Sequence, residues 1–397
     1  MASTRAARRK PKRSGGAGRP LSVALDGTPL IGSRTGIGEF CAGLLQALGR
    51  REDVKAGAFA ISWRMRHAMV TELPAGVEAI GRPMPARPLQ AAWRAGGFPP
   101  LEWFTGAVDV VHGTNFVVPP TRRAARVVTV SDLTMVHYPE MCQPATLRFP
   151  ALVSRAVSDG AWVHTHSQHV AAEVRNAFGV PPERVRVVYP GVPARWYPPA
   201  DPTAGDGVRA ALEAVGATRF VLALGTVEPR KGLPGLVRAF AQVGPARPDV
   251  AVVLAGPDGW GTAELEAALA DCPVADRVIR LGWVDEPTRR WLLGEAQVFA
   301  YPSLYEGFGF PPLEAMSAGT PVLTTSAGSL AEVAGGGALC VPPGDDDALA
   351  AALETLLDDP SERERLARRG SAWWPRFTWE QCGEGMSALY HEAARSS

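Results

Sequence analysis

Short apolar runs alternate with longer segments whose apolar residues recur every three or four positions along the first 190 residues. The first pair is an apolar run at 21–26 followed by a helical pattern that begins at Gly36 and Gly38 and ends at Leu48. Strands that alternate with helices are typical of a parallel sheet covered by helices on both faces. The further expected strands lie at 58–62, 108–112, 126–130, 161–164 and 185–188, and the further expected helices at about 144–158 and 169–178.

A stretch rich in proline and glycine, residues 190–207, interrupts this pattern. We place a domain boundary inside it, after residue 197, because such a stretch lacks periodicity and favours loops. The alternation then restarts, so the chain predicts two successive α/β domains with Rossmann-like parallel sheets, at 20–197 and 198–375. The second domain is expected to contain strands at 220–224, 250–254, 278–281, 298–301 and 321–324, and helices at 233–243, 262–271, 287–296, 311–318 and 346–357.

The end of the chain combines four aromatic residues between 373 and 379 with a helical pattern at 380–394. Aromatic side chains of this size need a packing partner. We therefore expect residues 376–397 to form a helix that crosses back onto the first domain.

The composition agrees with a globular protein of two or three domains, at roughly 100–200 residues each. Apolar residues make up 46% of the 397 residues and charged residues 20%, which excludes general disorder. The five cysteines include no C-x-x-C pair, so neither a disulfide framework nor a structural zinc site is indicated. A reducing compartment is expected. Because no apolar run approaches the roughly 20 residues that cross a bilayer, we expect a cytoplasmic protein.

The net charge of +1 conceals a strong asymmetry. Residues 1–19 hold seven basic residues and no acid, whereas the remainder holds 34 basic against 40 acidic residues. An acidic body argues against nucleic acid as a partner. We expect the tail at 1–19 to be disordered and solvated. The alternative is contact with an anionic membrane surface, which would place the protein peripherally at the inner membrane face.

The first candidate binding loop follows the expected strand at 220–224. It contains Gly225, Thr226 and the adjacent cations Arg230 and Lys231. Ligands of open parallel sheets bind beyond the carboxyl ends of strands. Arginine offers a planar fork for phosphate oxygens and lysine a compact charge, so this turn suits a diphosphate. The alternative is an ordinary solvated turn.

The second candidate loop lies between the strand at 298–301 and the next helix. Its glycines, Gly307 and Gly309, flank Phe308 and expose backbone N–H groups at a helix N-terminus, which favours an anion. Glu306 and Glu314 lie eight positions apart and suit the hydroxyls of a ribose or a hexose, since carboxylates accept hydrogen bonds. The alternative is an ordinary helix N-terminus with acidic residues and no ligand. Taken together, the two loops predict a nucleotide-sugar site.

These loops resemble the donor-binding domain of family 4 retaining glycosyltransferases, whose signature is an Arg-Lys turn followed by two glutamates eight positions apart. The first half is also similar, through segments at 26–38, 109–115, 128–134 and 189–192. The resemblance covers nearly all of residues 20–380. It implies the GT-B architecture, in which two Rossmann-like domains face a central cleft.

The resemblance also implies roles for individual residues. Arg230 and Lys231 would hold the donor diphosphate, Glu306 the hydroxyls of the transferred sugar, and Glu314 the ribose. The backbone of Gly307, Phe308 and Gly309 would line the sugar and phosphates. Apart from the resemblance, the pair Gly36 and Gly38 indicates a flexible turn whose backbone can approach the ligand from the other domain, although a G-x-G pattern alone has low specificity. The base would lie against three residues that follow the strand at 278–281, Gly282, Trp283 and Val284.

The implied reaction is the transfer of a hexose, mannose or glucose-like, with retention at the anomeric carbon. The implied donor is GDP-mannose or a UDP-sugar, and the acceptor a glycan, a lipid-linked or a small molecule. No cofactor and no metal are expected. The acids at 345–347 are expected to cap a helix rather than to bind a metal. Two alternatives stay open, a catalytically silent sugar-nucleotide binder and a nucleotide-sugar epimerase on the same fold.

One position departs from the family pattern. Ser131 stands where relatives often carry a histidine, and serine cannot take up a proton at neutral pH. In a front-side mechanism the departing diphosphate oxygen can act as the base. Asp132 is a candidate replacement base or a strand-end cap. His112 is a candidate on the acceptor side, whereas the histidines at 164, 166 and 169 are expected to be ordinary strand-end residues.

Overall fold

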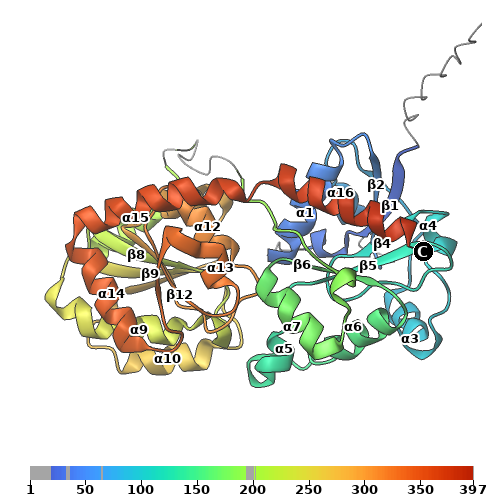
Figure 1. Ribbon diagram of the computed structural model, residues 1–397. Coiled ribbons are helices and arrows are strands. Elements are labelled where there is room, and N and C mark those ends of the chain that lie inside the picture. The colour runs from blue at the N-terminus through green and yellow to red at the C-terminus, as the bar shows by residue number, and fades with distance from the viewer. Residues whose placement is uncertain (1–18, 33–35, 64–65, 194–200, 202, 397) are drawn as a thin grey trace, which may run out of the picture.

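The computed structural model describes residues 19–32, 36–63, 66–193, 201 and 203–396, which form two lobes of parallel sheet and helix (Figure 1). The expected boundary after residue 197 and the tail at 1–18 lie outside the described residues. Among the described residues no helix combines the length and the apolar character needed to span a membrane.

The N-terminal lobe holds a seven-stranded parallel sheet in the order β3-β2-β1-β4-β5-β6-β7. Its strands are β1 Leu21–Asp26, β2 Val54–Phe59, β3 Glu78–Ala79, β4 Val110–Gly113, β5 Ala125–Val130, β6 Trp162–Thr165 and β7 Val185–Val187. Its helices are α1 Gly36–Leu48, α2 Arg66–Val70, α3 Ala86–Gly96, α4 Glu102–Thr105, α5 Thr134–His137, α6 Phe149–Ser158 and α7 Gln168–Phe178.

The C-terminal lobe holds a six-stranded parallel sheet in the order β10-β9-β8-β11-β12-β13. Its strands are β8 Arg219–Leu224, β9 Val250–Ala255, β10 Val278–Gly282, β11 Val298–Tyr301, β12 Val322–Thr325 and β13 Ala338–Val341. Its helices are α8 Asp206–Ala214, α9 Leu233–Val243, α10 Thr262–Ala270, α11 Glu286–Glu295, α12 Phe310–Ser317, α13 Leu330–Ala334, α14 Asp346–Asp358 and α15 Pro360–Trp373.

The predicted fold class, two parallel-sheet α/β lobes, is confirmed. Strands of both sheets are nearly continuous apolar runs because helices cover both faces, and all six residues of β9 are buried. Each sheet therefore separates two apolar cores. The expected helix at 144–158 begins only at Phe149, since Pro150 fits the first turn of a helix but not its interior.

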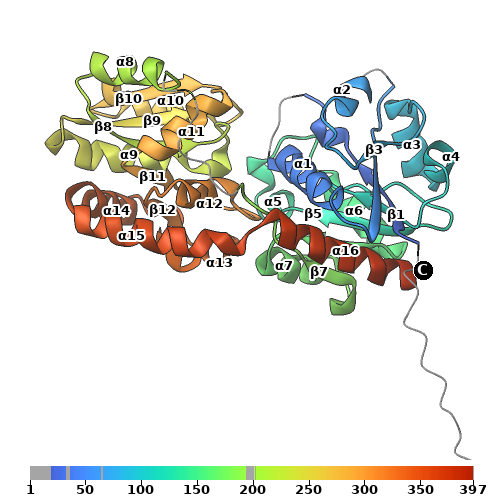
Figure 2. The same cartoon turned by 90° about the horizontal axis from the view of Figure 1, so that it is seen from above.

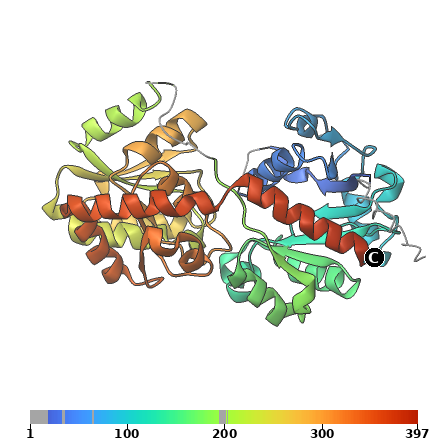
Figure 3. The same cartoon turned by 45° about the horizontal axis from the view of Figure 1, so that its top comes forward.

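The last helix, α16 Trp379–Arg395, leaves the C-terminal lobe and packs against α1 of the N-terminal lobe (Figures 2 and 3). Met386 and Tyr390 are fully buried in the core beneath α1. The ring of Trp379 lies so close to Gly43 that a Cβ there would overlap it. The chain thus passes between its lobes twice, once between β7 and α8 and once at the start of α16.

Candidate active site between the lobes

Arg230 and Lys231 lie in a short 3₁₀ turn, Pro229–Lys231, that joins β8 to α9. Gly232 ends this turn in the left-handed conformation, with φ of 63°, and a Cβ there would overlap the carbonyl oxygen of Pro302. Because β8 pairs with β11, this close approach brings the turn against the loop that follows β11. Gly225 lies beside the Lys231 side chain, and Thr226 follows it.

Glu306 is the centre of the charged cluster and is only 6% exposed. Its two carboxylate oxygens accept separate charged hydrogen bonds, at 2.7 Å from Arg230 Nη1 and at 2.7 Å from Lys231 Nζ. The hydroxyls of Tyr301 and Ser303 also donate to Glu306 Oε1, at 2.8 and 2.9 Å. Burial alone would raise the pKa of Glu306, but the two cations overcome it and lower the pKa to about 2.

The pKa values of the two cations shift in opposite directions. Burial and the neighbouring Arg230 lower the pKa of Lys231, against the pull of Glu306. For Arg230, burial is outweighed by Glu306 and Glu228, which raise its pKa. Arg230 also donates from Nε to Glu228 at 2.9 Å. The turn therefore fixes two cations, which the carboxylates of Glu306 and Glu228 balance, at a place where they can stabilise an anionic leaving group.

Glu314 lies in the second turn of α12 and is buried, but it does not join the cluster of Glu306. Its partner is Arg289 on α11, which forms an ion pair with it. Burial raises the pKa of Glu314, and Arg289 partly opposes this. The expected pair of glutamates is thus split between different cations.

A cavity of about 280 Å³ lies between the lobes beside Glu314. Glu39 and Gly43 line it from α1, Phe310 and Glu314 from α12, and Trp379 from the start of α16. Gly36 lies close to the Phe310 ring, since a Cβ on Gly36 would be in van der Waals contact with it. Gly38 is buried in α1. The glycine turn of the N-terminal lobe therefore faces α12.

The loop of Glu306 touches the N-terminal lobe at Gly307. A Cβ on Gly307 would overlap the carbonyl oxygen of Ser131, and Ser167 Oγ donates to the Gly307 carbonyl at 2.9 Å. Tyr305 accepts a hydrogen bond from the Leu133 amide at 3.0 Å. Glycine is required at 307 because no side chain fits between the lobes there. Phe308 is buried, and Gly309, with φ of 97°, immediately precedes α12.

Ser131 and Asp132 lie on the N-terminal side of this contact. Asp132 Oδ1 accepts from the Thr134 amide at 2.9 Å and from its hydroxyl at 2.8 Å, which is the geometry of a cap. The charge of Asp132 is still close enough to contribute to the raised pKa of Arg230. Ser131 Oγ is buried and has no hydrogen-bond partner among the described residues.

His112 is not on the acceptor side, and that expectation is wrong. The side chain is fully buried, and its Nδ1 and Nε2 lie 2.7 Å from the Tyr390 and Thr129 hydroxyls. The chain continues from Thr129 to His164, whose Nε2 donates to the Val188 carbonyl at 3.1 Å. This fixes the direction of every bond: the Thr129 hydroxyl donates to His164 Nδ1 and accepts from His112 Nε2, and the Tyr390 hydroxyl donates to His112 Nδ1. His112 therefore links α16 to the sheet.

The residues expected at the base lie apart from the charged cluster. Gly282, Trp283 and Val284 follow β10, which is separated from β8 by β9. Gly282 has φ of 67°, and Trp283 is 70% exposed. No group of three or more His, Cys, Asp or Glu side chains within the described ranges is arranged to hold a metal ion. The first of the acids at 345–347 caps α14, since Asp345 accepts from the Ala348 amide.

Sequence reasoning missed four residues of the site. Tyr301 and Ser303 stand in the same run as Glu306, so the spacing of polar residues after β11 is a usable signal. Arg289 gave no signal, because it is one of two adjacent arginines on an amphipathic helix. His166 had been assigned to ordinary strand ends, but its Nε2 is buried without a partner among the described residues.

Comparisons with known proteins agree with this geometry. Residues 35–196 match the model of "Glycosyltransferase Family 4", and residues 208–373 that of "Glycosyl transferases group 1". The O-antigen chain mannosyltransferase B of Escherichia coli is 32% identical over 277 residues, which cover 69% of this chain and 71% of that protein. The MMP alpha-(1->4)-mannosyltransferase of Mycolicibacterium hassiacum is 32% identical over 236 residues, 58% of this chain and 53% of that protein.

Solved structures share the architecture. Anabaena HepE in complex with UDP and glucose superimposes with a TM-score of 0.70 at 20% identity, covering 94% of this chain and all of that one. The sucrose-phosphate synthase of Thermosynechococcus elongatus gives 0.72 at 21% identity, covering 95% of this chain and all of that one. The two lobes therefore have the GT-B arrangement. With these matches, the chain belongs to the group 1, family 4 glycosyltransferases.

Proposed function

We propose that this glycosyltransferase moves a hexose from a nucleotide diphosphate sugar to an acceptor hydroxyl with retention at the anomeric carbon. The observation that carries the proposal is Glu306, a buried carboxylate held between Arg230 and Lys231 where the lobes meet. The cations that would bind the diphosphate are thereby fixed next to Glu306, the carboxylate that would accept hydrogen bonds from the sugar hydroxyls.

In the proposed reaction, the bond between the anomeric carbon and the diphosphate oxygen breaks, and its electron pair leaves with the diphosphate. Arg230 and Lys231 stabilise the charge that grows there. The acceptor oxygen bonds to the same face of the anomeric carbon, and its proton passes to the departing oxygen. Glu306 orients the transferred sugar. These side chains supply the charge stabilisation, so the proposal includes neither a metal nor a cofactor.

The nucleoside end is proposed to lie across α11 and α12. Glu314, oriented by Arg289, would accept hydrogen bonds from the ribose, with the base against Gly282, Trp283 and Val284. Mannose is supported as the transferred sugar by relatives named as mannosyltransferases, and a UDP-hexose by the bound ligands of HepE. GDP-mannose and UDP-glucose are therefore the first donors to test.

The test is a donor screen by mass spectrometry, with and without lipid-linked and glycoside acceptors. A retaining transferase forms a new glycoside only when acceptor is present, and NMR then shows the anomeric configuration of the donor in the product. Conversion of donor alone would favour an epimerase. Binding of the sugar nucleotide without product from any acceptor would favour a silent binder. An inverted product would refute the retaining mechanism.

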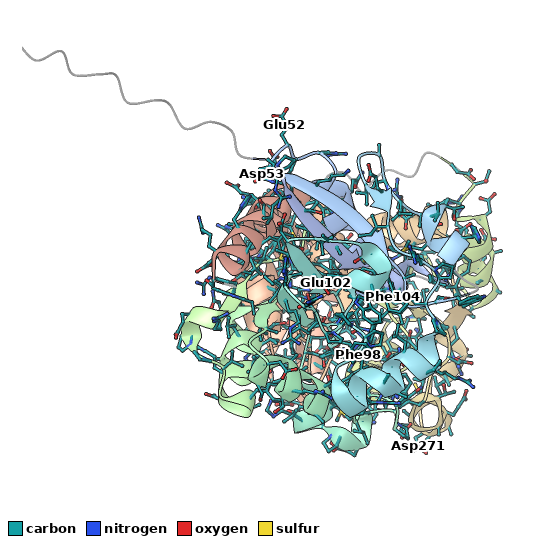
Figure 4. All side chains as sticks on the ribbon, turned by 90° about the vertical axis from the view of Figure 1, so that its right-hand side faces the viewer. Glu52, Asp53, Phe98, Glu102, Phe104 and Asp271 are labelled. Atoms are coloured by element: carbon teal, nitrogen blue, oxygen red, sulfur yellow. The ribbon has the colours of Figure 1, made fainter. Side chains whose placement is uncertain are left out.

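We also propose that the N-terminal lobe contacts an anionic membrane surface. Phe98 and Trp103 are 56% and 59% exposed, and their rings stack edge to face at 4.9 Å. Figure 4 shows Phe98 with Glu102 on the end of this lobe that faces away from the other. Glu102 is the sole acid between residues 80 and 107, and it accepts hydrogen bonds from three backbone amides at 122–124.

Charge complementarity selects an anionic lipid surface as the partner. Exposed arginines lie in the same stretch of chain as the two rings, at 82, 87 and 94, and in the segment that Glu102 binds, at 122 and 123. Interfacial aromatics combined with basic residues favour such a surface, at about 1 kcal/mol per basic residue. Reversing Arg87 and Arg94 to Glu should abolish sedimentation with phosphatidylglycerol vesicles, whereas Arg368→Glu on α15 should not. Equal sedimentation of both variants would refute the contact.

A further inference from the structure

Unpartnered polar atoms gather at one edge of the N-terminal sheet. Five buried side-chain atoms in the described part of the chain have no hydrogen-bond partner. Three of them follow neighbouring strands, Asn115 Oδ1 after β4, Ser131 Oγ after β5 and His166 Nε2 after β6. Buried polar groups are normally hydrogen-bonded, so a cluster of exceptions needs an explanation.

Ser131 and His166 are neighbours across the sheet. The last paired residues of β5 and β6 are Val130 and Thr165, so the two residues occupy the next position on adjacent strands. Both side chains are at least nine-tenths buried. The register therefore places the imidazole one strand away from the serine.

The C-terminal lobe closes over this pair. Ser131 touches Gly307 through its carbonyl oxygen, and the hydroxyl of Ser167, the residue after His166, bonds the Gly307 carbonyl. The His166 ring centroid lies 6.3 Å from that of Phe308 and 4.4 Å from that of Phe40 on α1. The unpartnered atoms are therefore adjacent to the loop that carries Glu306.

The chemistry of the two atoms selects a class of ligand. Burial and the neighbouring rings of His164 and His112 lower the pKa of His166 well below its usual value, so the imidazole is neutral. A neutral Nε2 donates in one tautomer and accepts in the other, and a serine hydroxyl does both. A hydroxyl group can accept from His166 in one tautomer and donate to it in the other. A phosphate is favoured by several donors or by positive charge, and this neutral pair supplies no charge.

We infer that His166, beside the candidate residue Ser131, belongs to the N-terminal wall of the sugar site and binds hydroxyl groups of a sugar held between this wall and Glu306. The inference rests on the proposed function, because it assigns the other side of the same site. The hydroxyls belong to the hexose of the donor or to a sugar acceptor, which share this chemistry. Since both side chains are enclosed, the lobes must separate at Gly307 to admit the sugar.

The test is His166→Phe, which keeps a ring against Phe40 and Phe308 and removes the nitrogen. Its kcat/KM in sugar transfer should fall roughly tenfold, the scale of one lost neutral hydrogen bond. The Kd for GDP or UDP alone should not change, because a nucleoside diphosphate carries no sugar at this position. The thermal midpoint should stay equal or rise, since an unpartnered buried atom has been removed. Ser131→Ala should behave in the same way.

Trp162→Phe is the matched control. Trp162 begins β6 at the end of the strand away from the lobe contact, and its Nε1 is also buried without a partner among the described residues. Its replacement removes the same kind of atom from the same strand and should leave kcat/KM at the wild-type value. An equal loss in Trp162→Phe and His166→Phe would assign the effect to packing and overturn the inference.

Two further comparisons separate the possible outcomes. A weaker Kd for the sugar nucleotide in His166→Phe assigns the hydroxyls to the donor, and a raised acceptor KM with unchanged donor Kd assigns them to the acceptor. Wild-type kcat/KM for both substrates in His166→Phe overturns the inference and leaves the proposed function intact. A wild-type protein that binds sugar nucleotides but transfers no sugar to any acceptor refutes the proposed function itself.

Discussion

The two walls of the site differ in how their polar groups are satisfied. On the C-terminal lobe, Glu306 pairs with Arg230 and Lys231, and Glu314 with Arg289. On the N-terminal lobe, the polar groups that follow β5 and β6 are uncharged, and Ser131 and His166 have atoms without partners among the described residues. We call the C-terminal group the charged wall and the pair Ser131 and His166 the neutral wall. The charged wall finds its ion-pair partners within its own lobe, whereas the neutral wall has polar atoms without hydrogen-bond partners among the described residues.

This difference follows from the ligand that each wall is proposed to meet. A diphosphate is bound by fixed positive charge, and a buried cation keeps its place only if a carboxylate is at hand. Sugar hydroxyls are bound by neutral groups, and these can stay unpartnered at a cost of about 1–3 kcal/mol each. Function would thus be obtained at some expense of stability in the N-terminal lobe, an exchange common at active sites.

The largest effect is expected for Glu306→Gln, which removes the negative charge at the centre of the C-terminal wall and keeps the shape of the side chain. Two partly buried cations would then face each other with only Glu228 to balance them, so the free energy of unfolding should fall by about 3 kcal/mol. Urea denaturation measures this change. Glu354→Gln, whose exposed carboxylate pairs with Arg247, should change it by less than about 1 kcal/mol. Equal stability of Glu306→Gln and wild type would show that the cluster is not a coupled unit.

Lys231→Ala tests the catalytic half of the same wall. Removing one group that stabilises the leaving diphosphate should lower kcat by ~10²–10³. Lys55→Ala is the control, since Lys55 is exposed on β2 and pairs with Glu78. Turnover is measured as nucleoside diphosphate released in the presence of acceptor. Wild-type turnover in Lys231→Ala would contradict the role of Lys231.

Acid should lower the free energy of unfolding through the buried histidines of the N-terminal lobe. Burial lowers the pKa of His164 to about 4 and those of His112 and His166 well below the usual value, so all three are neutral when folded. The unfolded chain takes up these protons below pH ~6.5, so stability is lost as the pH falls from there. Burial raises the pKa of Asp26 to about 6, which acts in the opposite direction.

The net expectation is a loss of about 3 kcal/mol in the free energy of unfolding between pH 7 and pH 5.5, at 1.36 kcal/mol per pKa unit for each group. Urea denaturation at the two pH values measures it. His166→Phe should remove about one third of the histidine contribution. Stability that stays level or rises over this interval would refute the neutral state of the three histidines.

The sequence predicted the charged wall better than the neutral one. Apart from Arg289 on α11, the residues of the charged wall come from two short runs, 225–232 and 301–314, and the carboxyl ends of neighbouring parallel strands bring such runs together. The neutral wall depends on packing that no local pattern records. His112 and His166 both stand near the ends of short apolar strands, but α16 covers the first and Phe308 approaches the second.

The prediction of helices and strands was limited in the same way, because it too depends on local patterns. The regular α/β alternation predicted most of the long helices, because an apolar stripe is a local signal. Helix α15 was missed, since only Leu366 and Gly370 are buried along it and its remaining residues are mostly charged or small. The strand expected at 58–62 lies at Val54–Phe59, because the parallel pairing of β2 with β1 begins at Val54.

The decisive measurement is a crystal structure of the protein with an intact sugar nucleotide. We expect phosphate oxygens within hydrogen-bond distance of Arg230 and Lys231, and the hexose between Glu306 on one side and Ser131 and His166 on the other. A diphosphate bound away from these two cations, or a hexose that touches neither wall, would contradict this expectation.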